Sequence, residues 1–106
     1  MNKLFPNSPL IFVARRISPR TTIPLILAIA NGYNRYSQLA ETFPMSSRTL
    51  AKSIKVMETE NMIKKCDDGT YELTQKGLEF SKHAKQMMRW FKKYYKDELK
   101  HCEFMY

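Results

Sequence analysis

The sequence of 106 residues is poor in the residue types that build disulfide scaffolds, zinc sites and phosphate-binding loops. Its two cysteines, Cys66 and Cys102, are too few for a disulfide framework and lack the paired spacing of a zinc site. Its three glycines do not form a glycine-rich phosphate loop. We therefore expect a protein of the reducing cytoplasm that carries no metal ion or other cofactor.

Long apolar runs are also absent. The longest stretch without a charged residue runs from Thr21 to Asn34, contains Pro24 and Gly32, and is too short to cross a bilayer. No carboxylates cluster on one predicted face, and no nucleophile has an evident base nearby. The sequence predicts neither an exported nor a membrane-spanning protein, and it does not predict an enzyme.

The charge is strongly positive and is concentrated at the two ends of the chain. The formal net charge is +8, and the hydrophobic fraction of 43% is enough for one core. Residues 1–20 contain no acid, and residues 75–106 contain twice as many cations as acids. Surplus lysine and arginine favour a polyanionic partner, which is either a nucleic acid or an acidic membrane surface.

Helical periodicity and capping residues predict five helices and one hairpin. Ser8 and Pro9 begin a short helix over residues 10–17, which Ser18 and Pro19 end. A buried helix begins at about residues 21–24 and stops at Asn31 and Gly32. After an extended piece at residues 35–36, Ser37 caps a helix that includes Phe43 and ends at Pro44.

The second half of the chain continues with a helix, a hairpin and a helix. Ser46 or Ser47 caps a helix that reaches about Glu60, with Asn61 as its stop. Residues 62–66 and 70–73 are short strands joined around Asp67-Asp68-Gly69, which is a tight-hairpin pattern. Thr74 caps a long helix from Gln75 to about Lys100. This order predicts a mainly α fold with a small β-hairpin, a winged helix-turn-helix domain with additional N-terminal and C-terminal helices.

Four segments in these elements form a family pattern: Tyr36-Ser37-Gln38-Leu39, Met45-Ser46-Ser47-Arg48-Thr49-Leu50, Met57-Glu58-Thr59-Glu60-Asn61-Met62-Ile63 and Tyr71-Glu72-Leu73-Thr74-Gln75-Lys76-Gly77. Through them, residues 22–90 resemble the HxlR-type branch of the winged helix transcriptional regulators, which neighbours the MarR and PadR groups. The last of the four segments resembles the family's strand-to-helix joint after the wing. The resemblance implies a dimeric DNA-binding regulator.

The chain departs from the family pattern in two respects. It has no cysteine before Cys66, whereas family members usually carry one ahead of the first core helix. Its wing is short and is tipped by Asp67 and Asp68, whereas the family's wing is longer and basic. We therefore do not expect a redox-sensing role, and we expect the wing to contribute little to DNA binding, because phosphates repel an acidic tip.

The predicted helix that begins near Ser46 has a basic outer face. If Leu50, Ile54 and Met57 point inward, the intervening cations lie on the opposite side. That side is the one a recognition helix presents to a major groove, although an ordinary solvated face has the same pattern. The residues predicted to contact DNA, including those of the wing flank, are Arg35, Ser46, Ser47, Arg48, Thr49, Lys52, Lys55, Lys64 and Lys65.

The C-terminal helix combines a wide apolar stripe with a basic face. Its aromatic and methionine residues exceed what packing on so small a domain needs, and such residues are enriched in association surfaces. The residues predicted to form a homodimer interface are Leu10, Phe12, Val13, Phe80, Ala84, Met87, Met88, Phe91, Tyr94 and Tyr95. A helix lying on an anionic membrane and a solvated face without a ligand remain as alternatives.

Taken together, these patterns predict three segments: an N-terminal arm over residues 1–20, a winged helix-turn-helix core over residues 21–74, and a dimerisation helix and tail over residues 75–106. The predicted function is a homodimeric, sequence-specific regulator of transcription that binds a pseudo-palindromic site in double-stranded DNA. The alternative is a winged helix used as a protein-interaction or architectural module, which the acidic wing favours. The pattern identifies no small-molecule effector.

Overall fold

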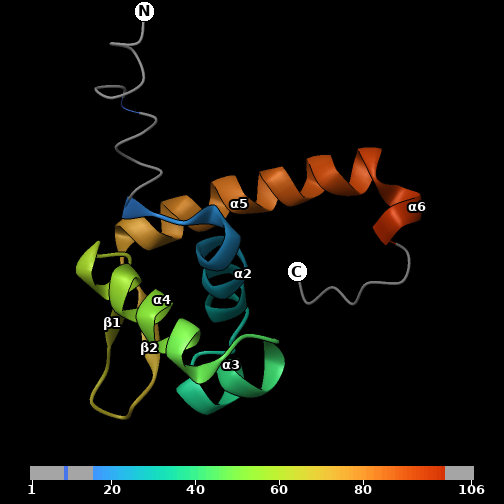
Figure 1. Ribbon diagram of the computed structural model, residues 1–106. Coiled ribbons are helices and arrows are strands. Elements are labelled where there is room, and N and C mark those ends of the chain that lie inside the picture. Colours follow the sequence, from blue (N-terminus) through green and yellow to red (C-terminus); the bar gives the residue numbers. More distant parts are fainter. Residues whose placement is uncertain (1–8, 10–15, 100–106) are drawn as a thin grey trace, which may run out of the picture.

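The computed structural model describes Pro9 and residues 16–99. Its elements are α2 (Pro19–Ala30), α3 (Tyr36–Thr42), α4 (Ser47–Thr59), β1 (Ile63–Lys65), β2 (Tyr71–Leu73), α5 (Gln75–Tyr94) and α6 (Lys96–Leu99). This is the predicted mainly α fold with one antiparallel hairpin, arranged as a winged helix-turn-helix (Figure 1). Within the described residues, no helix is both long enough and apolar enough to cross a membrane.

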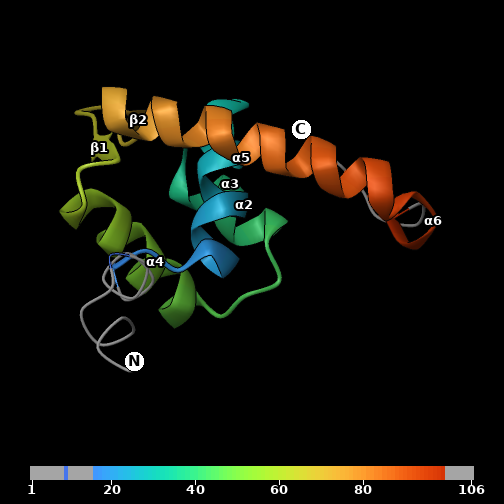
Figure 2. The same cartoon turned by 90° about the horizontal axis from the view of Figure 1, so that it is seen from above.

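The core is built around α2. Its residues 25–28 are completely inaccessible to solvent, which agrees with the prediction of a buried helix. The helix α5 crosses over α2 on one side, and the far end of α5 projects beyond the other elements together with α6 (Figure 2). The remaining buried apolar side chains are Ile29 of α2, Met62 between α4 and β1, and residues of every other element except α6: Leu39, Leu50, Ile54, Met57, Ile63, Tyr71 and Ala84.

The start of α2 lies earlier than the sequence pattern indicated. Pro19 occupies the first turn of α2, and Ser18 is extended at the cap position. A serine-proline pair fits either the end of one helix or the start of the next, because proline has a suitable fixed φ and no N–H to leave unsatisfied at a first turn. At the other end, Asn31 and Gly32 stop α2 as predicted, and Gly32 has a φ of 97°.

The start of α3 differs from the prediction. Ser37 was expected to cap this helix, but it lies inside the first turn, and Arg35 is at the cap position. The Gln38 side chain closes the turn instead, because its Oε1 accepts from the backbone N–H groups of Asn34 and Arg35, each at 3.1 Å. Phe43 lies beyond the last helical residue rather than inside α3.

The hairpin has the predicted strands in a defined register. Ile63 pairs with Leu73, and Lys65 pairs with Tyr71. Gly69 has a φ of 84°, and its N–H donates to the Cys66 carbonyl at 3.0 Å. A glycine in this conformation after the turn gives a three-residue loop, which is a common hairpin connection. Of the predicted extended piece at residues 35–36, Arg35 is extended and forms a single bridge with Thr70, whereas Tyr36 is already the first residue of α3.

The start of α5 is bound to the three residues that follow α4. The Met62 carbonyl accepts from the Thr74 N–H at 3.0 Å, and the Asn61 carbonyl accepts from the Thr74 hydroxyl at 2.6 Å. The same hydroxyl oxygen accepts from the Gly77 N–H at 3.1 Å, which is the predicted threonine cap. Asn61 has the φ of 61° expected of a helix stop. We refer to these contacts as the α4–α5 joint.

The C-terminal helix is shorter than predicted. It was expected to continue to about Lys100, but α5 ends at Tyr94, and Tyr95 has non-helical angles before the single turn of α6. The apolar periodicity continues across the break, which is why the pattern did not show it. Lys96 lies one turn after both Lys92 and Lys93, and like charges at that spacing disfavour a continuous helix.

Two groups of predicted residues lie outside the described residues. They are Lys100 at the predicted end of the last helix, and residues 10–15 of the N-terminal arm, which include Leu10, Phe12 and Val13 of the predicted dimer interface. Arg16 and Ile17 are described, and Ile17 packs against the core.

The joint gives a prediction at Gly77. A Cβ atom at this position would lie 2.0 Å from the Met62 carbonyl oxygen, so the two segments must move apart to accept Gly77→Ala. We expect this substitution to lower the free energy of unfolding by about 2 kcal/mol or more. Helix propensity alone predicts the opposite sign, a gain of roughly 1 kcal/mol. Urea unfolding at fixed protein concentration measures the difference.

The matched control for Gly77→Ala is Gln75→Ala, at an exposed position in the same turn. We expect this control to change the free energy of unfolding by no more than about 0.5 kcal/mol. An unchanged or increased stability of Gly77→Ala would contradict the close approach of α5 to Met62.

Candidate nucleic-acid interface

The helix α4 presents its cations on one side and its apolar residues on the other, as predicted. Leu50, Ile54 and Met57 are at most 3% exposed. Arg48, Lys52 and Lys55 are all exposed, and they lie on the face that the core does not cover. The buried side chains therefore fix which face of α4 is available, and that face is basic.

The start of α4 is sharply defined by Ser46. Its Oγ accepts from the Thr49 N–H at 3.1 Å, so Ser46 rather than Ser47 is the cap. The Ser46 hydroxyl also donates to Thr49 Oγ1 at 3.0 Å. Because Ser46 has one hydroxyl proton and uses it in this contact, Thr49 is the better donor for a phosphate. Ser47 is exposed next to both.

The helices α3 and α4 lie next to each other as a helix-turn-helix pair (Figure 1). The Tyr36 hydroxyl, at the start of α3, donates to the Ser47 carbonyl at the start of α4, at 3.3 Å. Leu39 of α3 and Leu50 of α4 both enter the core. These contacts fix the N-terminal half of α4, which is the half that a recognition helix inserts into a groove.

The basic residues of the wing are partly neutralised by an acid within the hairpin. Lys64 and Glu72 are cross-strand partners, and their Nζ and Oε1 atoms are 3.5 Å apart. Both side chains are more than half exposed, so this ion pair adds little stability. Lys65 is also exposed, on the neighbouring position of β1. The pairing leaves Lys65 as the stronger candidate of the two for a phosphate contact.

The acidic tip of the wing is used in the turn itself. Asp68 Oδ1 accepts from the N–H and the hydroxyl of Thr70, at 3.0 and 2.6 Å. These two hydrogen bonds stabilise the ionised carboxyl and lower the pKa of Asp68. Asp68 therefore stabilises the turn at the tip of the wing.

Arg35 lies against the wing rather than beside α4. Its Nη1 donates to the Asp68 carbonyl at 3.0 Å, and its backbone pairs with Thr70. Arg35 therefore holds the tip of the hairpin, a role that no sequence pattern indicated, because the two residues are 33 positions apart. The guanidinium has further donors and is exposed, so its predicted contact with DNA remains a prediction.

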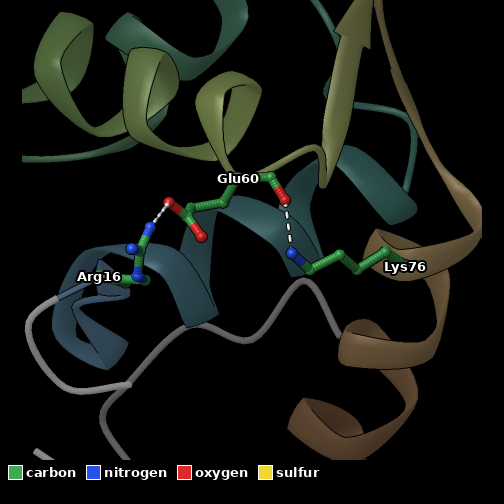
Figure 3. A network of polar contacts seen from close by, with 3 residues as sticks. All are labelled: Arg16, Glu60 and Lys76. Carbon is green, nitrogen blue, oxygen red and sulfur yellow. Dashed lines mark hydrogen bonds and ion pairs between the residues drawn. The ribbon is translucent and has the colours of Figure 1, made fainter. Parts of the chain in front are cut away.

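Three segments of the chain meet at Glu60, at the end of α4 (Figure 3). Its Oε2 lies 3.4 Å from Nη1 of Arg16, and its carbonyl accepts from Nζ of Lys76 at 2.7 Å. The contact brings Arg16 of the N-terminal arm beside α4. Lys52 and Lys55 line the same shallow depression as Arg16, so the arm adds a cation next to the basic face.

Cys66 lies at the base of the wing with its thiol against an acid. Its Sγ donates to Glu72 Oε2 at 3.1 Å, and this hydrogen bond is the main reason that the pKa of Cys66 is raised. The same contact lowers the pKa of Glu72. A thiol with a raised pKa is a poor nucleophile at neutral pH.

The predicted dimer residues fall into two groups along α5. Ala84 is 3% exposed and belongs to the core, so its burial within the chain corrects its assignment to a partner surface. Phe80 and Met88 pack against the core and are half-buried. The predicted residues that are exposed lie in or just after the second half of α5: Met87, Phe91, Tyr94 and Tyr95. Periodicity placed all of them on one stripe and did not show where the core ends.

No metal-binding group of three or more histidine, cysteine or acidic residues occurs in the described ranges. His83 is exposed on α5.

Comparison with known proteins gives two matches. The profile of the HxlR-like helix-turn-helix family matches residues 17–99. A protein of Methanocaldococcus jannaschii, named as an uncharacterized HTH-type transcriptional regulator, is 32% identical to this chain over 79 residues, which cover 70% of this chain and 74% of the relative. No solved structure matches the chain significantly.

The Cys66–Glu72 contact gives a prediction in a Cys102→Ser background, in which Cys66 is the remaining cysteine. Glu72→Gln removes the negative charge that disfavours the thiolate, so the pKa of Cys66 falls. Because the thiolate is the reactive form, we expect alkylation by iodoacetamide at pH 8 to become several times faster. Mass spectrometry over a time course measures the rate.

Glu79→Gln is the control for Glu72→Gln, since it removes the same charge from an exposed position on α5. We expect this control to leave the alkylation rate unchanged. Equal rates for Glu72→Gln and its parent would show that Glu72 does not control the thiol.

Proposed function

Because the chain belongs to the HxlR-like helix-turn-helix family, we propose that it is a homodimeric, sequence-specific regulator of transcription that binds double-stranded DNA in the cytoplasm. The observation that carries this proposal is the exposed basic face of α4, opposite the buried Leu50, Ile54 and Met57. The name of the Methanocaldococcus jannaschii relative supports the same class of function. The proposed role requires no catalytic group and no cofactor.

In this proposal the first two turns of α4 enter the major groove. Arg48 and Ser47 face base edges, because a guanidinium matches the paired acceptors of guanine and a hydroxyl serves either base type. Lys52 lies one turn further along the same face, and Lys55 is positioned for a backbone phosphate. Thr49 donates to a phosphate at the helix start, where the helix dipole also favours an anion.

The wing and the arm have supporting roles. The Lys64–Glu72 pair and the acidic tip leave the hairpin with little net attraction for a minor groove. Lys65 contacts the backbone from the strand flank. Arg16, held beside α4 by Glu60, supplies a further cation along the same side of the molecule. DNA binding therefore depends on α4 and its neighbours more than on the wing.

The exposed end of α5 supports dimerisation. Trp90, Phe91, Tyr94 and Tyr95 form a cluster: the Trp90 ring lies 5.1–6.0 Å from the other three rings, centroid to centroid, and Phe91 lies 5.6 Å from Tyr95. Their exposed fractions run from 39% to 61%, and Met87 beside them is 47% exposed. A second copy that packs on this cluster through a two-fold axis would place two α4 helices for a pseudo-palindromic site.

The alternative function is a protein-interaction or architectural module. The observation that favours it is the acidic wing tip, where Asp67 and Asp68 are both exposed. The two proposals differ in whether the chain binds any duplex, so the experiment below separates them.

The proposed contacts of α4 with DNA give a prediction for Arg48 and Lys52. We expect Arg48→Ala and Lys52→Ala each to weaken binding to a site selected from random duplex DNA by about 1–3 kcal/mol, because each removes a contact to a base edge or a phosphate. Electrophoretic shifts across a salt series measure the affinity and its salt dependence. The control is Lys82→Ala, which removes one charge from the exposed surface of α5.

We expect the control to change the affinity far less than either α4 variant. If the wild-type chain binds no duplex even at low salt, the regulator proposal fails and the protein-interaction alternative stands. Equal losses for Lys82→Ala and Arg48→Ala would show that the attraction is general and not directed by α4.

The proposed dimer interface gives a prediction for Phe91. We expect the wild-type chain to be a dimer at micromolar concentration, and Phe91→Glu to weaken the dimer by at least about 2 kcal/mol, because it places a charge inside an aromatic interface. Sedimentation equilibrium measures both. The matched control is Leu78→Glu, which makes a similar change at an exposed apolar residue of α5 outside the cluster. A monomeric wild-type chain contradicts the proposed interface.

A further inference from the structure

A pocket of about 270 Å³ lies where the end of α2 meets α5, and nothing described above uses it. Its lining residues are Asn31, Lys85, Met88, Arg89 and Lys92. The volume is slightly below the range of pockets that hold drug-sized ligands, so it suits a small molecule. The pocket lies away from the outer face of α4, since it shares no residue with that face.

The walls of the pocket are strongly basic. Lys85, Arg89 and Lys92 follow one another at spacings of four and three residues, which places them on one face of α5. No acid of the described residues lines the pocket, and the acid of α5, Glu79, lies more than one turn before Lys85. Like charges at these spacings repel one another, so an anion among them would relieve an unfavourable arrangement.

The end of α2 does not account for these cations. Cations often serve the unpaired carbonyls at the end of a helix, but three of the carbonyls in the last turn of α2, those of Leu27, Ala28 and Ile29, already have partners. The Leu27 carbonyl accepts from the backbone N–H and the side-chain amide of Asn31, at 3.1 and 2.8 Å. The Ala28 carbonyl accepts from the N–H groups of Asn31 and Tyr33, and the Ile29 carbonyl accepts from that of Gly32.

Two of the cations that line the pocket, Lys85 and Arg89, have N–H donors that are available for a ligand. Within residues 16–99, neither Lys85 nor Arg89 has a hydrogen-bond or ion-pair partner. Both are exposed at the rim, whereas Met88 between them is half-buried and packs against the core. The pocket therefore offers charged donors around an apolar floor, which is the combination that recognises an anion attached to an apolar group.

We propose that this pocket binds a small anionic molecule, a carboxylate or phosphate ester that carries an apolar group. Arg89 forms a two-point contact with the anion, and Lys85 supplies a second charge. The Met88 side chain contacts the apolar group. The Asn31 amide nitrogen already donates to the Leu27 carbonyl, so the donors to the anion come from Arg89 and Lys85.

The test titrates the isotope-labelled full chain with four probes at constant ionic strength: benzoate, phenyl phosphate, acetate and inorganic phosphate. Backbone amide shifts at Asn31 and Arg89 report binding. We expect each phenyl compound to bind about tenfold more tightly than its counterpart without a ring, because the ring covers Met88. The tighter of the two phenyl compounds identifies whether the natural anion is a carboxylate or a phosphate.

Three variants locate the site. We expect Lys85→Gln and Arg89→Gln each to weaken binding of the phenyl compounds about tenfold or more, since each removes a charge-assisted hydrogen bond. Lys82→Gln is the matched control, because Lys82 is exposed on α5 and does not line the pocket. We expect it to leave binding unchanged. All three positions are on the surface, and thermal melts confirm that each variant is folded.

Three results overturn the proposal. If the compounds with and without the ring bind with equal affinity, Met88 does not contact an apolar group of the ligand. Equal losses for Lys82→Gln and Arg89→Gln show a diffuse attraction to the basic helix. Loss of duplex binding in Lys85→Gln, with no saturable shift for any small anion, assigns this face to DNA.

Discussion

The carbonyls of Glu60, Asn61 and Met62 are all bound by groups from the start of α5, and the orientation of α4 depends on those contacts. Lys76 binds the first carbonyl, and Thr74 binds the other two through its hydroxyl and its N–H. The backbone of α5 then passes so close to Met62 that position 77 has no room for a Cβ atom. In the proposed regulator this joint connects the helix that faces DNA to the helix that faces the second copy, so it sets the spacing of the two recognition helices.

Charge is distributed so that α4 carries most of the proposed recognition. The wing of a winged helix domain usually adds phosphate contacts, but in this hairpin the acids serve other groups: Glu72 lies against Lys64 and Cys66, and Asp68 closes the turn. Arg35 holds the wing tip by its carbonyl. Arg48, Lys52 and Lys55 lie together on the exposed face of α4, so that face attracts a polyanion more strongly than the wing does.

The helix α5 performs different tasks along its length. Its first half completes the core through Gly77, Ser81 and Ala84, which are all buried. Its second half extends past the core with exposed aromatic rings on one side and cations on the other. The basic pocket beside Asn31 lies along the beginning of the second half, where Met88 still packs against the core. A ligand bound there would contact both the end of α2 and the helix that is proposed to pair.

The sequence by itself determined the order of the described elements, the buried face of α4, a serine cap for α4, the Thr74 cap of α5 and the Asp-Gly turn, because each depends on residues within a few positions of one another. Tertiary structure alone decided which end of α5 is buried, that Arg35 binds the wing tip, that Cys66 faces Glu72, and that Glu60 brings Arg16 and Lys76 together. The tertiary structure also decided the helix boundaries at Pro19, Arg35 and Tyr95, because the local sequence patterns fitted more than one helix start or end. The physical reason is the same in each case. Periodicity shows which face of a helix is apolar, but only tertiary packing shows which residues bury that face and how far along the helix the burial extends.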